Sequence, residues 1–181
     1  MDSNDIRARF VSFFEARAHL PVASASLVVQ GDPSVLLTSA GMQQFKPFYL
    51  DPARAPSRRA VSIQKCMRTS DIEEVGDATH HTFFEMLGNF AFGATHGGGY
   101  FKREAIAYAY EFVVQELGLP IERVWATTWS GEPGIPPDDE AVELWQAAGM
   151  PLARIRGLNR KPDGSRENFW GPTGDSGPCG P

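Results

Sequence analysis

The chain has 181 residues, of which 42% are hydrophobic and 22% are charged, as is typical of a folded domain with its own core. Its formal net charge of −5 argues against a protein that binds nucleic acid over its whole surface, although a local basic groove stays compatible with it. Two distant cysteines give neither metal-ligand spacing nor a disulfide framework, and without a signal-like or membrane-spanning apolar run we expect a cytoplasmic protein.

The first predicted element is a helix near the N-terminus. Apolar residues at positions 6, 10, 13 and 14 repeat at the spacing of one buried helix face. Ser3 or Asn4 is expected to cap its start, and Pro21 places its end before residue 19 or 20. A short strand over 35–37 and a short amphipathic segment over 43–49 follow.

Two strands joined by an acidic loop are predicted next. Residues 61–68 alternate between apolar and polar side chains, and residues 80–90 combine two histidines, three phenylalanines and a carboxylate. The segment 69–79 between them is acidic. We therefore expect an antiparallel hairpin, with His80 and His81 pointing to opposite faces of its second strand.

Helices and strands alternate in the rest of the chain. A helix is predicted over 100–117, with a buried stripe at positions 101, 105, 108, 109 and 112 and Gly118 just beyond its end. A strand over 124–129, a helix opened by Pro137 and ended by Gly149, and a short strand over 154–156 follow. Glycine recurs every third residue from 171 to 180, which favours a glycine-rich loop, and the chain stops inside that loop, so we expect a truncated chain.

Several polar and aromatic residues are candidates for binding. Arg68 ends the alternating strand on its polar face, where a guanidinium can grip a phosphate, whereas the arginines at 54, 58 and 59 are better explained as a solvated basic face. His80, Phe84 and Met86 form either the floor under a flat ligand or an ordinary buried strand, and the pattern alone leaves both open. The acids at 71, 73, 74 and 77 indicate a solvated loop more than a metal cluster.

Four tryptophans divide into two groups. Trp125, Trp129 and Trp145 are most simply explained as core residues. Trp170 lies beside glycine and proline, which allow close backbone approach, so we expect it to line a pocket.

The chain resembles the alanyl-tRNA synthetases, which are class II aminoacyl-tRNA synthetases. The resemblance rests on blocks that occur in the family's order over nearly the whole chain, at residues 38–46, 66–68, 71–76, 80–93, 100–102, 168–170 and 177–181. It implies an α+β fold, an antiparallel sheet flanked by helices, with residues 1–181 forming the first part of the catalytic domain and ending before the third class signature.

The resemblance also implies a reaction and its participants. Such enzymes join L-alanine to ATP, assisted by Mg²⁺, and pass the alanine to tRNA(Ala); zinc belongs to family parts that are absent here. Arg68 corresponds to the arginine that grips the α-phosphate and the amino-acid carboxylate. His80 corresponds to a residue near the β- and γ-phosphates, Phe84 to the ring that stacks on adenine and Met86 to a neighbour of the base. Trp170 corresponds to a residue that lines the alanine pocket.

Departures from the family and rival explanations are also part of this expectation. Ser39 stands where the family usually has asparagine, and residues 94–99 lengthen a link. We expect the fragment alone to be inactive or nearly so in adenylate formation. The alternatives are a non-catalytic synthetase-like module that binds nucleotide or RNA, and a structural domain that dimerises; pairing into a homo-oligomer is left open.

Overall fold

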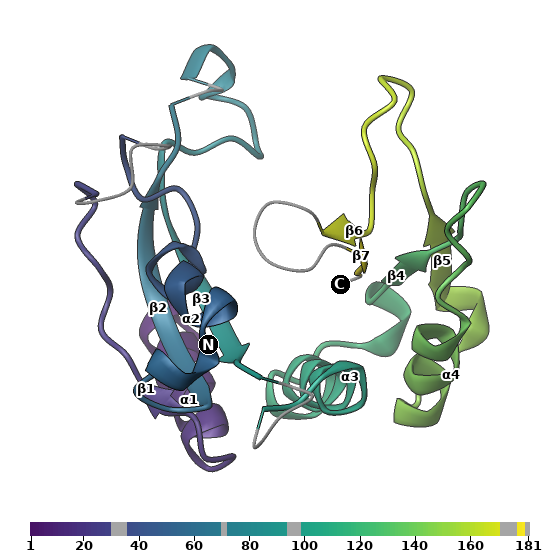
Figure 1. Ribbon diagram of the computed structural model, residues 1–181, viewed down its shortest axis with the longest axis horizontal. Helices are drawn as coiled ribbons and strands as arrows, with labels where there is room; N and C mark the ends of the chain where they lie inside the picture. Colours follow the sequence, from purple (N-terminus) through teal and green to yellow (C-terminus); the bar gives the residue numbers. More distant parts are fainter. Residues whose placement is uncertain (30–35, 70–71, 94–98, 171–176, 180–181) are drawn as a thin grey trace. The chain divides into compact units, whose positions relative to one another are not determined.

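The computed structural model describes residues 1–29, 36–69, 72–93, 99–170 and 177–179, which form helices and small sheets (Figure 1). They divide into two compact units, Met1–Gly99 and Tyr100–Pro181. The α+β class predicted from the sequence is confirmed, but the sheets contain parallel as well as antiparallel strand pairs. The predicted insertion at 94–99 and the glycine-rich loop lie largely outside the described residues.

The first unit opens with helix α1, Ser3–Glu15. The expected N-cap was wrong by one or two residues, because Asp2 is the cap. Its carboxylate accepts the backbone N–H groups of Asn4 and Asp5, and the Asp5 carboxylate accepts the N–H of Asp2, which closes a capping box. The predicted apolar face is confirmed, since the three phenylalanines of α1 are buried.

A three-stranded sheet forms the centre of this unit. Strand β1, Leu20–Pro21, runs parallel to β2, Arg59–Met67, and β2 pairs antiparallel with β3, Phe83–Ala91. Helix α1 reaches the sheet face that carries Glu85, because Arg7 Nε donates to a Glu85 carboxylate oxygen at 2.6 Å. The predicted antiparallel hairpin is present as β2 and β3. Helix α1 covers one of its faces.

The second strand of the hairpin begins later than predicted. His80 and His81 precede β3 and lie in the connecting loop, so the expectation that strand geometry turns them to opposite faces was wrong. The predicted strand over 35–37 is also absent from the part that is described: Leu37 forms only an isolated bridge with Val28, and Val35 is outside the described residues.

The other face of the hairpin is covered by a 3-10 helix, Gln43–Phe45, and by helix α2, Lys46–Leu50. Phe45 is buried here, and its ring centroid lies 4.3 Å from that of Phe90. Further 3-10 helices occupy Pro52–Arg54, Ile72–Glu74, Ile121–Arg123 and Leu152–Arg154.

The polar face of β2 is buried rather than solvated. Gln64 is fully buried, and its amide hydrogen-bonds with Ser24 Oγ, the backbone of Ala25 and the Gln44 side chain. A buried amide is tolerated because its donors and acceptor are satisfied. This network ties the segment before Ser26 to the hairpin.

The second unit begins with helix α3, Lys102–Tyr110, which continues as a π-helical turn over Glu111–Glu116. The predicted stripe was only partly right: Phe112 is buried, but the buried residue within α3 is Ile106, and Phe101 is exposed. Gly118 has the positive φ of 69° expected beyond a helix end.

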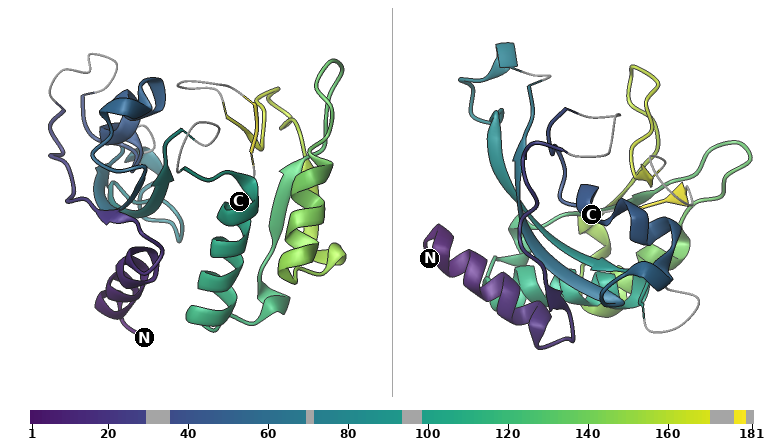
Figure 2. Two further views of the ribbon diagram at one scale, coloured as in Figure 1. Left: turned by 60° about the horizontal axis from the view of Figure 1, so that its bottom comes forward. Right: turned by 60° about the vertical axis from the view of Figure 1, so that its left-hand side comes forward.

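A parallel strand pair and a helix complete the core of this unit. Strand β4, Ala126–Trp129, pairs with β5, Ile155–Leu158, and helix α4, Asp139–Ala148, lies alongside them (Figure 2). Asp138 caps α4 and Gly149 ends it at a φ of 114°, as predicted for the glycine. A short antiparallel pair, β6 over Phe169–Trp170 and β7 over Gly177–Pro178, follows. None of the helices in the described ranges is long and apolar enough to cross a membrane.

Two of the three tryptophans predicted to be core are buried. Trp129 and Trp145 are 1% and 6% exposed, and Trp145 packs with Ile106 and Leu144. Trp125 is 45% exposed, so that prediction was wrong. It immediately precedes β4 and occupies the side of the strand that faces away from the core.

Candidate active site

A cavity of about 310 Å³ lies at the loop end of the β2–β3 hairpin. Its lining residues come from the end of β2, the connecting loop and the start of β3: Arg68, Val75, Thr79, His80, His81 and Phe84. Three of the residues predicted to bind a ligand, Arg68, His80 and Phe84, therefore share one cavity. His81 lines the same cavity as His80.

Arg68 brings a cation to this cavity. Its Nε donates to the Ser39 carbonyl oxygen at 3.1 Å, and its backbone N–H donates to the Thr82 carbonyl oxygen at 2.9 Å. Its guanidinium carbon lies 5.2 Å from the centroid of the Phe84 ring. In the described parts of the chain Arg68 forms no ion pair. The guanidinium is thus oriented by a carbonyl group that does not neutralise it, which suits a site for an anion.

The Ser39 carbonyl is a site feature that the sequence did not reveal. The loop before α2 presents it, and Gln43 holds that loop because its side-chain oxygen accepts the Ser39 N–H at 3.0 Å. A backbone carbonyl is present at every residue, so no residue type signals this role. The glutamine and the neighbouring Gly41 are the only local clues in the sequence.

His80 is anchored by the acidic loop. Its Nδ1 lies 2.7 Å from an Asp77 carboxylate oxygen, and its Nε2 lies 3.5 Å from a Glu74 carboxylate oxygen. The same carboxylate of Asp77 accepts the backbone N–H groups of His80 and Thr79. These N–H groups, together with the side chains of His80 and Thr79, hold the pKa of Asp77 well below its usual range. Asp77 is therefore the residue that fixes the imidazole at the cavity wall.

Met86 is not one of the cavity-lining residues. It lies on the same face of β3 as Phe84, opposite Gln64 on β2. Its Sδ is 3.2 Å from the Gly41 backbone nitrogen, and a Cβ at Gly41 would approach the Met86 Cβ to 3.3 Å. Met86 thus packs beneath the loop that holds the Ser39 carbonyl.

The acidic residues of the loop do not form a metal centre in the described part. Glu73, Glu74 and Asp77 are described, whereas Asp71 is not, and the described residues contain no group of three or more ligands placed to hold a metal ion. Asp77 instead uses its carboxylate in the loop itself.

Trp170 lies in the second unit, on β6, and is 36% exposed. The residue two positions before it, Asn168, has a positive φ of 54°, donates from Nδ2 to Thr127 Oγ1 at 2.7 Å and accepts the N–H of Cys179 at 2.7 Å. Phe169 packs edge-on to Trp129, with ring centroids 5.2 Å apart. These contacts fix the backbone that presents Trp170.

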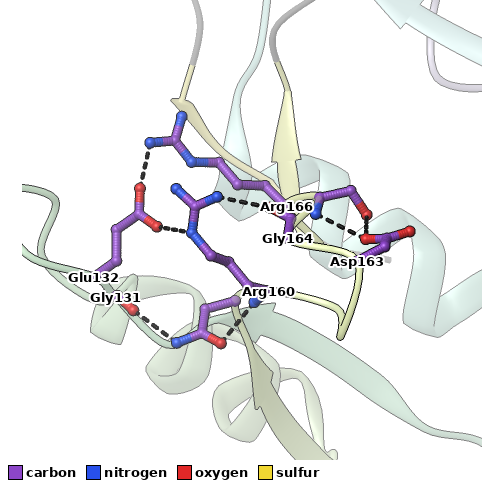
Figure 3. A network of polar contacts seen from close by, with 8 residues as sticks. Gly131, Glu132, Arg160, Asp163, Gly164 and Arg166 are labelled. Carbon is purple, nitrogen blue, oxygen red and sulfur yellow. Dashed lines mark hydrogen bonds and ion pairs between the residues drawn. The ribbon is translucent and has the colours of Figure 1, made fainter.

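A charged network around Glu132 holds the segment between β5 and β6, where Arg160 and Arg166 form an isolated bridge. Glu132 accepts from Arg160 Nε at 2.7 Å and from the Arg166 guanidinium, and Arg160 also donates to the Gly164 carbonyl at 2.7 Å (Figure 3). The hydrogen bond from Arg160, followed by that from Arg166, lowers the pKa of Glu132. Arg166 also lies over the Phe169 ring at 4.4 Å. Glu132 therefore binds both residues of the Arg160–Arg166 bridge, and Arg166 in turn contacts Phe169, the neighbour of Trp170.

Comparisons with known proteins agree with this architecture. Residues 5–181 match the family model described as tRNA synthetases class II (A). The chain is 50% identical over 181 residues to the alanine–tRNA ligase of Rubrobacter xylanophilus, covering 100% of the chain and 19% of that protein. It is 51% identical over 179 residues to the alanine–tRNA ligase of Dehalococcoides mccartyi strain BAV1, covering 99% and 19%. For the alanine–tRNA ligase of Chloroflexus aurantiacus the identity is 49% over 181 residues, covering 97% and 19%. The chain thus spans about a fifth of the length of these curated relatives.

Proposed function

The chain belongs to the class II tRNA synthetases, and we propose that the protein carrying it is an alanine–tRNA ligase. In this proposal the protein joins alanine to ATP, releases pyrophosphate and transfers alanine from the adenylate to the 3′ end of tRNA(Ala), in the cytoplasm. The observation that carries the proposal is the identity of about half of all positions with alanine–tRNA ligases over nearly the whole chain. The cavity that joins Arg68 to Phe84 supplies a physical basis for it.

Arg68 is proposed to serve the first step. An oxygen of the alanine carboxylate forms a bond to the α-phosphorus of ATP, and the bond from that phosphorus to the bridging oxygen breaks as pyrophosphate leaves. Negative charge has to be held on the α-phosphate throughout. A guanidinium fixed beforehand by the Ser39 carbonyl provides this stabilisation without reorganising during the reaction. It also draws the two anions, carboxylate and triphosphate, together.

Phe84, His80 and Met86 are proposed to hold ATP. The Phe84 ring is only partly buried at the cavity, which leaves surface for an adenine base to stack on. His80, which Asp77 holds at the cavity, is proposed to meet the β- and γ-phosphates. Met86 supports the Gly41 loop beneath the base. Mg²⁺ that travels with ATP reduces the repulsion between its phosphates and the incoming carboxylate.

Trp170 is proposed to line the alanine pocket. Alanine offers only a methyl group beyond its ammonium and carboxylate, so a site for it needs a flat, rigid wall close to that methyl. Trp170 is a rigid ring whose backbone is anchored by the pairing of β6 with β7 and by the hydrogen bonds of Asn168. Such a wall excludes larger side chains more effectively than it excludes glycine or serine.

The proposal is tested by alanine-dependent exchange of pyrophosphate into ATP, measured on the natural gene product that contains this chain. We expect exchange with alanine, and a fall of about 10²–10³ in kcat on Arg68→Ala, the effect usual for loss of one preorganised donor. Arg54→Ala is the matched control, because Arg54 is an exposed arginine of the same unit that does not line the cavity. Its exchange rate is expected to stay within about twofold of the parent, as for an ordinary surface change.

Three results would each contradict a part of the proposal. Binding of ATP without any exchange would favour the non-catalytic module instead. Exchange that depends on an amino acid other than alanine would keep the family and remove the assigned substrate. Equal losses in the Arg68 and Arg54 variants would remove Arg68 from the reaction.

A further inference from the structure

An exposed aromatic ring with two arginines against it lies in the second unit and has no part in the proposed reaction. Trp125 is 45% exposed. The guanidinium carbon of Arg154 lies 4.7 Å from the Trp125 ring centroid, and that of Arg156 lies 4.4 Å from it. We refer to Trp125, Arg154 and Arg156 as the Trp125 platform.

The register of the parallel strands builds this platform. Ala126 of β4 pairs with Ile155 of β5, and both pack in the core of the second unit. Side chains alternate along a strand, so the residues flanking these two point to the opposite, outer face. Trp125 precedes Ala126, and Arg154 and Arg156 flank Ile155. Arg156 of β5 is thereby turned to the outer face, and Arg154, which ends the 3-10 helix just before β5, lies against the same Trp125 ring.

The charge of the platform is left uncompensated by the described residues. Arg154 and Arg156 form no ion pair there, nor does Arg123, an exposed arginine two positions before Trp125. Three other cations of this unit are paired instead: Lys102 contacts two carboxylates, and Arg160 and Arg166 contact Glu132. In a chain of net charge −5 a local set of cations beside an exposed ring is therefore a distinct surface.

We propose that the Trp125 platform binds RNA, with the two guanidinium groups on backbone phosphates and a base against the exposed part of the Trp125 ring. A guanidinium stacked on an aromatic ring keeps its N–H donors at its edge, where they meet phosphate oxygens. An exposed ring flanked by cations is the combination that accommodates single-stranded or unstacked bases with little sequence preference. The assignment of this RNA as tRNA rests on the proposed function, which makes tRNA a substrate.

The test measures tRNA binding and pyrophosphate exchange in parallel on the gene product that contains this chain. Arg154→Gln/Arg156→Gln is expected to raise the dissociation constant for tRNA about 10- to 100-fold, as for the loss of one or two charge-assisted contacts. The slope of log affinity against log salt should fall by roughly 0.7–0.9 for each lost phosphate contact. Alanine-dependent exchange, which needs no tRNA, should stay within about twofold, since the platform lies outside the assigned site.

Matched variants separate charge, stacking and folding. Arg103→Gln removes an exposed arginine of α3 in the same unit, and it should leave tRNA affinity unchanged. Trp125→Phe should bind more tightly than Trp125→Ala, because a phenyl ring still stacks. Unchanged exchange shows that each variant is folded, and if the double variant loses exchange, the single changes Arg156→Lys and Trp125→Phe carry the test.

Distinct outcomes overturn the inference and the proposed function. Unchanged tRNA affinity in the double arginine variant and in Trp125→Ala would overturn the inference. A change of oligomeric state with unchanged tRNA affinity would do the same and would identify the platform as a protein contact. If the parent protein shows no alanine-dependent exchange while RNA binding still depends on the platform, the proposed function fails and the platform remains an RNA site.

Discussion

Replacing Phe84 by alanine is the sharpest probe of how ATP is held. The ring lines the cavity and lies 5.2 Å from the Arg68 guanidinium carbon, so its removal takes away the proposed adenine platform and leaves the cation in place. Stacking of a base on an aromatic side chain contributes about 1–3 kcal/mol. That free energy corresponds to a rise of roughly 5- to 150-fold in the KM for ATP.

Phe84→Ala should affect the KM for ATP and not kcat, because the contact between adenine and the Phe84 ring is the same before and during the reaction. Adenine does not change as the α-phosphorus reacts, so the interaction stabilises ground state and transition state alike. We therefore expect Phe84→Ala to raise the KM for ATP with little change in kcat, whereas Arg68→Ala lowers kcat. The assay is alanine-dependent pyrophosphate exchange over a range of ATP concentrations.

Phe83 provides the matched control. It is the neighbouring phenylalanine, opposite Met67 in the register, 49% exposed and absent from the cavity lining. Phe83→Ala removes the same side chain from the other face of the hairpin and should leave the KM for ATP within about twofold. Equal effects of the two changes, or a loss of kcat alone in Phe84→Ala, would refute the stacking role.

Two further predictions concern folding. A Cβ at Gly88 would lie 2.5 Å from Phe90 Cζ, inside a buried aromatic cluster, so Gly88→Ala should lower the free energy of unfolding by about 1–3 kcal/mol in urea titrations. Phe90→Leu should recover part of that loss in the double variant, and strictly additive losses would contradict the steric cause. Burial is the main reason that the pKa of His19 lies below its usual value of 6.5 in the folded chain. The unfolded chain therefore binds a proton at His19 more readily, and stability is lost as the pH falls below about 6.5. Melting temperatures should show this slope in the parent and lose it in His19→Gln; the same slope in both would exclude His19.

The elements that carry the cavity follow from periodicity in the sequence. The alternation of apolar and polar residues over 61–68 predicts the first strand of the hairpin. Residues directly opposite each other in an antiparallel pair have their side chains on the same face of the sheet. Arg68 continues the face of Cys66, which opposes Phe84, so the two candidates meet at the end of the hairpin. Helix ends were predictable for a similar reason, because Gly118 and Gly149 adopt positive φ values that other residues rarely take.

The start of β3 was not predictable from alternation. The aromatic pattern runs on through His80, but the Asp77 carboxylate captures the backbone N–H groups of Thr79 and His80 and holds them in a turn. A local side-chain hydrogen bond thus overrides strand propensity there. A sequence pattern does not show how close a carboxylate comes to the backbone N–H groups two or three residues further along the chain.

Burial of single residues was also beyond the sequence. Gln64 lies on the polar side of the alternating strand, yet it is fully buried because its amide finds partners from segments some 20 and 40 residues away along the chain. Trp125 is apolar and was assigned to the core, yet the strand register turns it outward beside two arginines. In both cases the outcome is decided by partners distant in sequence.

The central claim is that the hairpin cavity holds the adenylate, and a complex with a non-reactive analogue of alanyl-adenylate tests it most directly. The gene product would be crystallised with an analogue in which a sulfamoyl group replaces the phosphate. We expect the adenine against the Phe84 ring and the sulfamoyl group at the Arg68 guanidinium. An analogue bound elsewhere, with neither side chain in contact, would contradict it.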